Sequence, residues 1–219
     1  MKQFWLNRKI RKCEQQRDVR ADDPVFFDEL ATLYKKSDQV EAAIDCYQHA
    51  IEAYYREDSR LGVNNEFILN VCNNLCELDA LNPLAHQTIG QELCGLSQFD
   101  DAARLYTGFA AKLAAAGRYE EAIHQYRNAF VLHPDDIKGR QQCFALLWKL
   151  RRKDEAVQEL RKIAELAEQK GLLAKAVECY TKALKIRPSS PELQAELRRL
   201  VHTHRHQPGQ LRLVVNNGA

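Results

Sequence analysis

Residues 99–134 read FDDAARLYTGFAAKLAAAGRYEEAIHQYRNAFVLHP and contain one helical pattern twice. In each copy an alanine stands four residues before a tyrosine, first as Ala102 and Tyr106 and then as Ala122 and Tyr126. The second copy ends at Pro134. The same phrase returns 54 residues further on, at Ala176, Tyr180, Ala183 and Pro188. Repetition at a fixed spacing indicates a repeat architecture before any single helix is assigned.

The spacing A-x3-Y-x2-A-x4-P, preceded by L-[AG]-x2-[YL], resembles the tetratricopeptide repeat family. The unit of that family is a pair of antiparallel helices of about 34 residues. The resemblance implies an all-α fold, a right-handed solenoid or superhelix of antiparallel helices. It also implies a surface that binds peptides or proteins and carries out no chemistry.

The predicted helices fall into three groups of three, and one group spans about 54 residues. The middle helix of each later group is expected to pair with the helix before it and the helix after it. This grouping is similar to that of bacterial tetratricopeptide proteins with triplet periodicity. The predicted helices are 25–36, 39–56 and 64–80, then 84–96, 99–115 and 119–132, then 137–150, 154–169 and 172–186.

The chain is expected to have four regions. Residues 1–20 form a basic amphipathic helix, residues 21–188 the repeat domain, and residues 189–205 a C-terminal capping helix. Residues 206–219 form a tail, which is either disordered or the first strand of a further domain. Seven basic and two acidic side chains give residues 1–20 a net charge of +5, although the 219-residue chain carries only +2. The first helix therefore either caps the first repeat, lies on an anionic membrane or docks on a partner.

Composition places the protein among soluble cytoplasmic proteins. Apolar residues make up 45% and charged residues 28%, and no apolar run approaches the roughly 20 residues of a membrane-spanning helix. The N-terminus lacks the features of a secretory signal. The seven cysteines are best explained as buried free thiols in a reducing compartment.

The sequence offers no motif for catalysis, so we expect neither an enzyme nor a cofactor. It contains no P-loop, no Rossmann glycine pattern and no HExxH. Cys72 and Cys76 share a helix with apolar neighbours and lack further ligands at zinc spacing, while the histidines at 202, 204 and 206 fit a solvated tail. The basic run 149–153 is followed at once by Asp154 and Glu155, which fits a solvated helix junction and argues against nucleic-acid binding. We therefore expect neither a metal site nor a nucleic-acid partner.

The resemblance also implies where a ligand would bind, on the concave face formed by the first helix of each pair. The carboxylate clamp of some family members needs Lys and Asn where this chain has Asp28, Thr32, Gln87 and Gln91, so that clamp is absent. The positions transferred to this sequence as candidate protein-binding residues are Asp28, Thr32, Lys35, Lys36, Gln87, Gln91, Gln141, Trp148 and Lys149.

Trp148 is the leading candidate, because an exposed tryptophan often dominates a protein interface. The alternative is that it packs against a neighbouring helix. We therefore expect a non-enzymatic scaffold that binds a partner protein or peptide. Two alternatives remain open at this point: a module that assembles into homo-oligomers, and an adaptor recruited to a membrane through residues 1–20.

Overall fold

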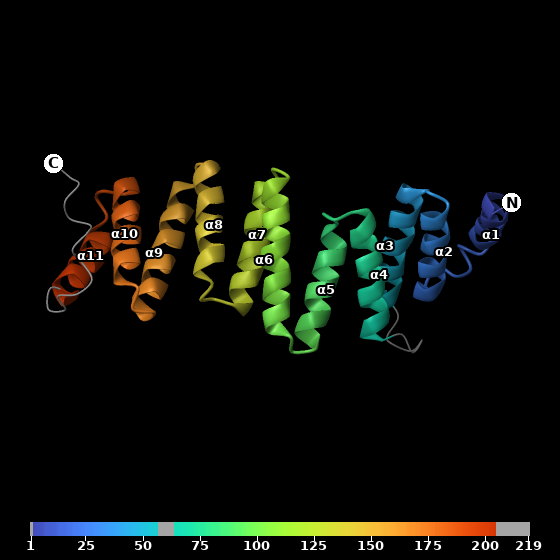
Figure 1. The fold of residues 1–219 in the computed structure, drawn as a ribbon, viewed down its shortest axis with the longest axis horizontal. Coiled ribbons are helices and arrows are strands. Elements are labelled where there is room, and N and C mark those ends of the chain that lie inside the picture. The colour runs from blue at the N-terminus through green and yellow to red at the C-terminus, as the bar shows by residue number, and fades with distance from the viewer. Residues whose placement is uncertain (1, 57–63, 205–219) are drawn as a thin grey trace. The chain divides into compact units, whose positions relative to one another are not determined.

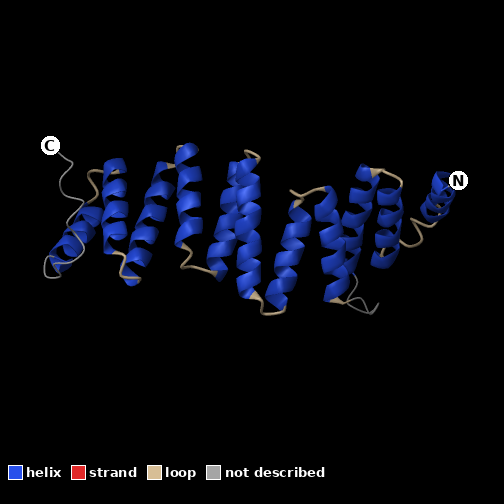
Figure 2. Cartoon of the chain, in the orientation of Figure 1, coloured by secondary structure: helices blue, strands red, loops and turns tan. Residues whose placement is uncertain are grey.

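The computed structural model describes residues 2–56 and 64–204, and every regular element in these two ranges is an α-helix (Figures 1 and 2). The chain divides into two compact units, residues 1–109 and residues 110–219, with the boundary inside α6. We describe each unit separately. The all-α class and the antiparallel, tetratricopeptide-like arrangement of successive helices are confirmed. The predicted tail at 206–219 lies outside the described residues.

The helices of both units fall within a few residues of the predicted ranges. Unit 1 contains α1 (Lys2–Glu14), α2 (Pro24–Lys36), α3 (Val40–Arg56), α4 (Asn65–Leu78), α5 (Pro83–Gly95) and the first part of α6 (Phe99–Ala115). Unit 2 contains the rest of α6, then α7 (Tyr119–Leu132), α8 (Ile137–Lys149), α9 (Lys153–Gln169), α10 (Leu173–Ile186) and α11 (Pro191–His204).

Helix lengths follow a regular order along the chain. From α2 to α10 they run 13, 17 and 14 residues, three times over. The helices α8, α9 and α10 begin 54 residues after α5, α6 and α7, respectively. This regularity supports the grouping in threes.

Each group of three helices begins with a side-chain cap. The side chains of Asp23, Asn82 and Asp136 accept hydrogen bonds from the first-turn amides of α2, α5 and α8 at 3.0–3.1 Å. Ser190 accepts one from the Leu193 amide at the start of α11. Such caps satisfy amides that would otherwise lack a partner and fix where the helix starts. The caps at 82, 136 and 190 again stand 54 residues apart.

Each described turn that follows α2, α5, α6, α8 or α9 places one residue in the left-handed region. Gly117 and Gly171 take this position after α6 and α9, with φ of 80° and 71°. Asp38, Ser97 and Arg151 take it after α2, α5 and α8, with φ of about 60°. Glycine adopts this conformation freely, whereas a side chain adopts it at a cost in free energy.

The core of unit 1 lies between α2, α3, α4 and α5, and α1 covers its N-terminal side. Phe26, Phe27 and Tyr47 are buried beside small residues such as Ala43, which let neighbouring helices approach closely. Leu6 of α1 is 3% exposed and Ile10 is 6% exposed, and Ile10 belongs to the same cluster. This burial supports the capping interpretation of the first helix.

The core of unit 2 uses the tyrosines and alanines that revealed the repeat. Tyr126 and Tyr180 are each 1% exposed, and Ala122, Ala176 and Ala183 are fully buried. One cluster joins α7, α8 and α9, and a second joins α9, α10 and α11. The middle helix α9 therefore packs on both sides, as the periodicity predicted.

All seven cysteines are free thiols, with Cys46, Cys72, Cys143 and Cys179 buried and the other three partly buried. Within the described residues, no helix combines the length and apolar character required to cross a membrane.

Candidate functional site

In unit 1 two of the four candidate residues of α2, Thr32 and Lys35, contact other helices of the same unit. Lys35 Nζ donates to Glu77 Oε2 at 2.6 Å and to Asn74 Oδ1 at 3.3 Å, both on α4. The Thr32 hydroxyl lies 3.4 Å from the Tyr47 hydroxyl of α3. We call this surface the α2–α4 face, and it consists of Asp28, Thr32, Lys35, Tyr47, Asn74 and Glu77.

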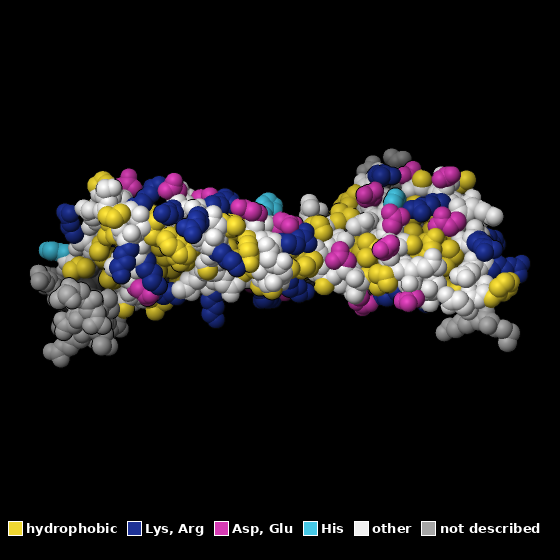
Figure 3. Space-filling model, turned by 90° about the horizontal axis from the view of Figure 1, so that it is seen from above, with side chains coloured by type: hydrophobic (Ala, Val, Ile, Leu, Met, Phe, Trp, Pro, Cys, Tyr) yellow, Lys and Arg dark blue, Asp and Glu magenta, His cyan; other side chains and the backbone are white. Residues whose placement is uncertain are grey.

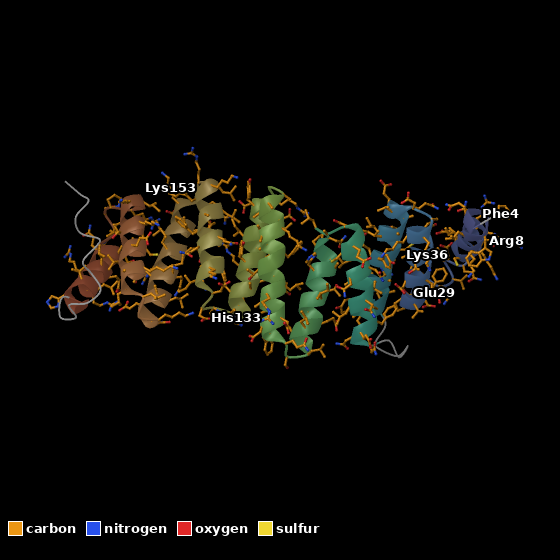
Figure 4. All side chains as sticks on the ribbon, in the orientation of Figure 1. Phe4, Arg8, Glu29, Lys36, His133 and Lys153 are labelled. Carbon is orange, nitrogen blue, oxygen red and sulfur yellow. The ribbon has the colours of Figure 1, made fainter. Side chains whose placement is uncertain are left out.

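Asp28 differs electrostatically from the rest of the α2–α4 face. Burial raises the pKa of Asp28 above its ordinary value, and the neighbouring Glu29 carboxylate raises it further. By contrast, the hydrogen bond to Glu77 raises the pKa of Lys35 and so favours its charged form. Lys36 and Glu29 are exposed at the surface of α2 (Figure 4).

Gln87 and Gln91 are exposed on α5, but this helix adjoins α3 and α4 rather than α2. The link to α3 is a hydrogen bond of 2.7 Å from the Tyr55 hydroxyl to Glu92 Oε1. In an antiparallel row of helices, alternate helices share a layer. By this rule α2 and α4 share one layer, and α3 and α5 share the other. The structure therefore does not bring Gln87 or Gln91 into the α2–α4 face.

In unit 2 the candidate residues of α8 lie on one exposed stripe. Gln141 and Trp148 are both exposed and stand seven residues apart, which is two helical turns. Trp148 is 49% exposed, so half of its indole surface faces solvent. Lys149 Nζ donates to the Tyr119 hydroxyl at 2.6 Å and lies 4.2 Å above the ring centroid. We call Gln141, Trp148 and Lys149 the α8 surface.

The α8 surface continues into the turn before α9, where a shallow pocket of about 280 Å³ is lined by Trp148, Lys149, Arg151 and Lys153. Lys153 projects outward at the start of α9 (Figure 4). On this side of unit 2, Lys and Arg side chains lie among hydrophobic ones (Figure 3). Arg151 and Lys153 are not among the residues predicted from the sequence, because the basic run 149–153 fits a solvated helix junction. Their position three and five residues after Trp148 is the feature of the sequence that places them near it.

A second exposed surface lies on α1, opposite the side that covers unit 1. Phe4 is 78% exposed and Trp5 is 54% exposed. Phe4 and Arg8 lie on the side of α1 directed away from α2 (Figure 4). A broad pocket of about 540 Å³ borders this side, and Lys9 Nζ lies 4.1 Å above the Trp5 ring. We call this surface the α1 outer face, and it consists of Phe4, Trp5, Arg8, Lys9, Arg11 and Lys12.

The cysteines and histidines considered in the sequence do not assemble into a site in the described part of the chain. Burial raises the pKa of the Cys72 thiol to about 12, so this thiol stays protonated at neutral pH and is a poor nucleophile. No group of three or more potential metal ligands occurs among the described residues. His202 is exposed, while position 206 lies outside the described range.

Comparison with known proteins returns repeat proteins. The tetratricopeptide repeat model matches residues 27–56 and 162–190. No curated protein sequence matches the chain. Among solved structures, MamA is similar over 76% of this chain and 91% of its own, with 18% identity and a TM-score of 0.34.

Two further solved structures cover more of this chain. BtubC from P. vanneervenii is similar over 98% of this chain and 96% of its own, with 14% identity and a TM-score of 0.40. YrrB, described as a TPR protein with an unusual peptide-binding site, is similar over 85% of this chain and 97% of its own, with 16% identity and a TM-score of 0.28.

The first family match covers most of α2 and the whole of α3 in unit 1, and the second covers the end of α9 and the whole of α10 in unit 2. In both matches, the alanines and tyrosine of the second helix are the buried residues that hold the helix pair together. Tetratricopeptide repeats are in general protein-interaction modules. The tetratricopeptide repeat model therefore matches one helix pair in each unit.

Proposed function

We propose that this chain is a non-enzymatic scaffold that captures a partner protein or peptide, and that the α8 surface contributes most to binding. The observation that carries the proposal is the 49% exposure of Trp148 beside a pocket. Gln141 and Lys149 complete the contact along α8. A cytoplasmic location is part of the proposal, supported by the seven free thiols.

A half-exposed tryptophan suits a binding role for a physical reason. It offers a large apolar contact area, and only two side-chain torsions must be fixed when a partner binds. Trp148 is followed by a turn that needs no aromatic residue, since Cys94 occupies the corresponding place before the turn that follows α5. The fold therefore tolerates a small residue where this chain exposes an indole.

The experiment begins by identifying partners by affinity capture with the full chain. Binding of a purified partner is then measured by calorimetry for the parent and for Trp148→Ala, which we expect to weaken binding by at least tenfold. Val131→Ala on α7 is the matched control, because Val131 is 81% exposed and lies outside the α8 surface. Equal affinity of the parent and Trp148→Ala would remove Trp148 from the site.

The same two proteins, the parent and Trp148→Ala, are used to test self-assembly. Light scattering after size-exclusion chromatography gives the mass of the chain in solution. A stable oligomer that Trp148→Ala dissociates would mean that the α8 surface binds a second copy of this chain in place of another protein.

A second candidate function is favoured by the α1 outer face. Arg8, Lys9, Arg11 and Lys12 are exposed around Phe4 and Trp5, whereas Arg17 is held by Asp45 at 2.6 Å. Exposed aromatic and cationic side chains on one helix face suit the surface of an anionic membrane. Because Leu6 and Ile10 are buried, α1 could carry this face while remaining packed on unit 1.

Sedimentation with vesicles tests membrane contact. The parent should sediment with vesicles that contain phosphatidylserine and remain in solution with neutral phosphatidylcholine. Replacement of Arg8, Lys9, Arg11 and Lys12 by glutamine should abolish sedimentation without loss of helicity. Binding that persists in this variant, or that is equal for neutral vesicles, would exclude an electrostatic membrane contact through α1.

A further inference from the structure

We infer that the turn between α8 and α9 recognises an acidic peptide segment, with glutamate or aspartate side chains flanking an apolar residue. This inference rests on the proposed function and specifies the chemistry of the partner. The recognition surface is the pocket lined by Trp148, Lys149, Arg151 and Lys153.

The first argument compares three turns with the same place in a group of three helices. The turns after α2, α5 and α8 each place the second residue after the helix in the left-handed region, namely Asp38, Ser97 and Arg151. The three residues differ in charge although their backbones agree. The turn therefore requires the backbone conformation and does not require a cation.

The other positions of the pocket vary in the same way. Lys153 corresponds to Phe99 and to Val40, the first residues of α6 and α3. Lys149 corresponds to Gly95 at the end of α5. Only the turn after α8 combines three cations with an exposed tryptophan, so the fold does not explain this combination.

The second argument concerns the neighbouring carboxylates, which already have arginine partners. Arg118 donates to Glu121 at 2.7 Å, and Arg152 donates to Glu155 at 2.6 Å and also to Glu120. Asp154 accepts a hydrogen bond from Arg187. These four acidic side chains, Glu120, Glu121, Asp154 and Glu155, are therefore paired with arginines outside the pocket.

The three cations of the pocket, Lys149, Arg151 and Lys153, have no carboxylate partner among the described residues. Lys149 contacts the neutral phenol of Tyr119. Among the residues that the structure describes, no ion pair or side-chain hydrogen bond occupies Arg151 or Lys153. An acidic segment would supply the missing carboxylates, and an apolar side chain between them would cover the exposed indole of Trp148. Opposite charges across an interface give specificity and faster association.

The test uses two fluorescein-labelled peptides and the full chain. In the first peptide glutamates flank a leucine, and in the second every glutamate is replaced by glutamine. Fluorescence anisotropy should show that the glutamate peptide binds more tightly, and that its binding weakens as salt rises, since salt screens exposed charges.

The triple variant Lys149→Gln, Arg151→Gly and Lys153→Gln should weaken binding of the glutamate peptide about tenfold. Glycine is chosen at Arg151 because it adopts the left-handed backbone without strain. The control variant carries Lys112→Gln, Lys138→Gln and Lys185→Gln, which removes the same charge from exposed positions elsewhere and should leave binding unchanged.

Three results would overturn the inference: equal binding of the two peptides, an equal loss in the control variant, or no binding of the glutamate peptide at low salt. The proposed function is judged separately by the captured partner. If Trp148→Ala weakens that partner's binding while the triple variant and salt do not, the scaffold function stands and the acidic partner is rejected.

Discussion

The α2–α4 face and the turn after α8 use corresponding residues in opposite ways. Lys35 and Trp148 each stand three residues before the left-handed residue of their turn. Lys35 is bound to Glu77 and Asn74 on a neighbouring helix. Trp148 exposes half of its surface. The position within the repeat therefore does not determine whether a side chain stabilises the fold or remains available to a partner.

The difference arises from the neighbouring helices. On the α2–α4 face, α4 supplies a carboxylate and an amide within reach of Lys35. In unit 2, the carboxylates near the turn are taken by arginines, and the lysine next to Trp148 binds a phenol. The repeat determines the position of a side chain on its helix. The residues on adjacent helices determine whether that side chain is bonded within the fold or available to a partner.

The largest expected effect compares the aromatic residues of the two regions. Tyr47 is 1% exposed and Trp148 is 49% exposed. We expect Tyr47→Ala to lower the free energy of unfolding by about 3–5 kcal/mol, as for other large buried aromatics. Trp148→Ala should cost less than about 1 kcal/mol, because half of the side chain is already in water. Urea denaturation followed by circular dichroism measures both.

A control separates the ring of Tyr47 from its hydroxyl. Tyr47→Phe keeps the ring and removes only the long contact of 3.4 Å with Thr32. Its cost should be well below that of Tyr47→Ala. If Trp148→Ala destabilised the chain as much as Tyr47→Ala, Trp148 would be a structural residue and the contrast between the two regions would fail.

The second effect concerns the backbone of the turn after α8. Arg151 adopts a φ of 59°, where a residue with a side chain costs about 1–2 kcal/mol relative to an unstrained conformation. Arg151→Gly should therefore raise the free energy of unfolding by about 1 kcal/mol. Gly171→Ala, at a φ of 71°, should lower it by a similar amount. A loss of stability in Arg151→Gly would show that the arginine side chain supports the fold.

The smallest effect is expected at Asp28, the partly buried carboxyl group of the α2–α4 face. Its pKa is raised by burial, so folding favours the protonated form. The stability that comes from this protonation is present below the ordinary pKa of 3.8 and is lost as pH rises through the folded pKa. Asp28→Asn should therefore stabilise the chain at pH 7, by no more than about 0.5 kcal/mol.

The gain in Asp28→Asn should shrink as the pH is lowered toward 3.8, because the parent aspartate then becomes neutral as well. Thermal unfolding at a series of pH values measures this gain. A gain that does not change with pH would show that the charge of Asp28 is not the cause.

Most of the fold could be predicted from the sequence, because the repeat places small and large residues at fixed spacings. Small alanines mark close helix contacts, and tyrosines mark the spaces between helices, so Ala122 and Tyr126 indicated a helix pair that the core confirms. Aspartate is among the residue types that favour the N-cap position, and the carboxylates of Asp23 and Asp136 cap α2 and α8. Gly117 and Gly171 likewise stand at helix ends in the left-handed conformation that glycine favours.

The candidate surfaces were harder to predict, because they depend on residues far apart in the sequence. The contact of Lys35 with Glu77 spans 42 residues and leaves no local pattern. The left-handed turns at Ser97 and Arg151 were missed, because the residue types do not favour that conformation. Gln87 lies outside the α2–α4 face for a geometric reason, since α5 stands three helices after α2 and alternate helices of an antiparallel row share a layer.

The odd number of helices in each group has a consequence for how such a chain can change. Within each unit, successive helices alternate in direction (Figure 1). After three helices the next helix therefore runs opposite to the first helix of the group, whereas after two or four helices it would run in the same direction. Duplication or deletion of one group would turn every downstream surface over, whereas a change by two groups would preserve it. Gene rearrangements that keep a bound partner in place should therefore come in steps of six helices.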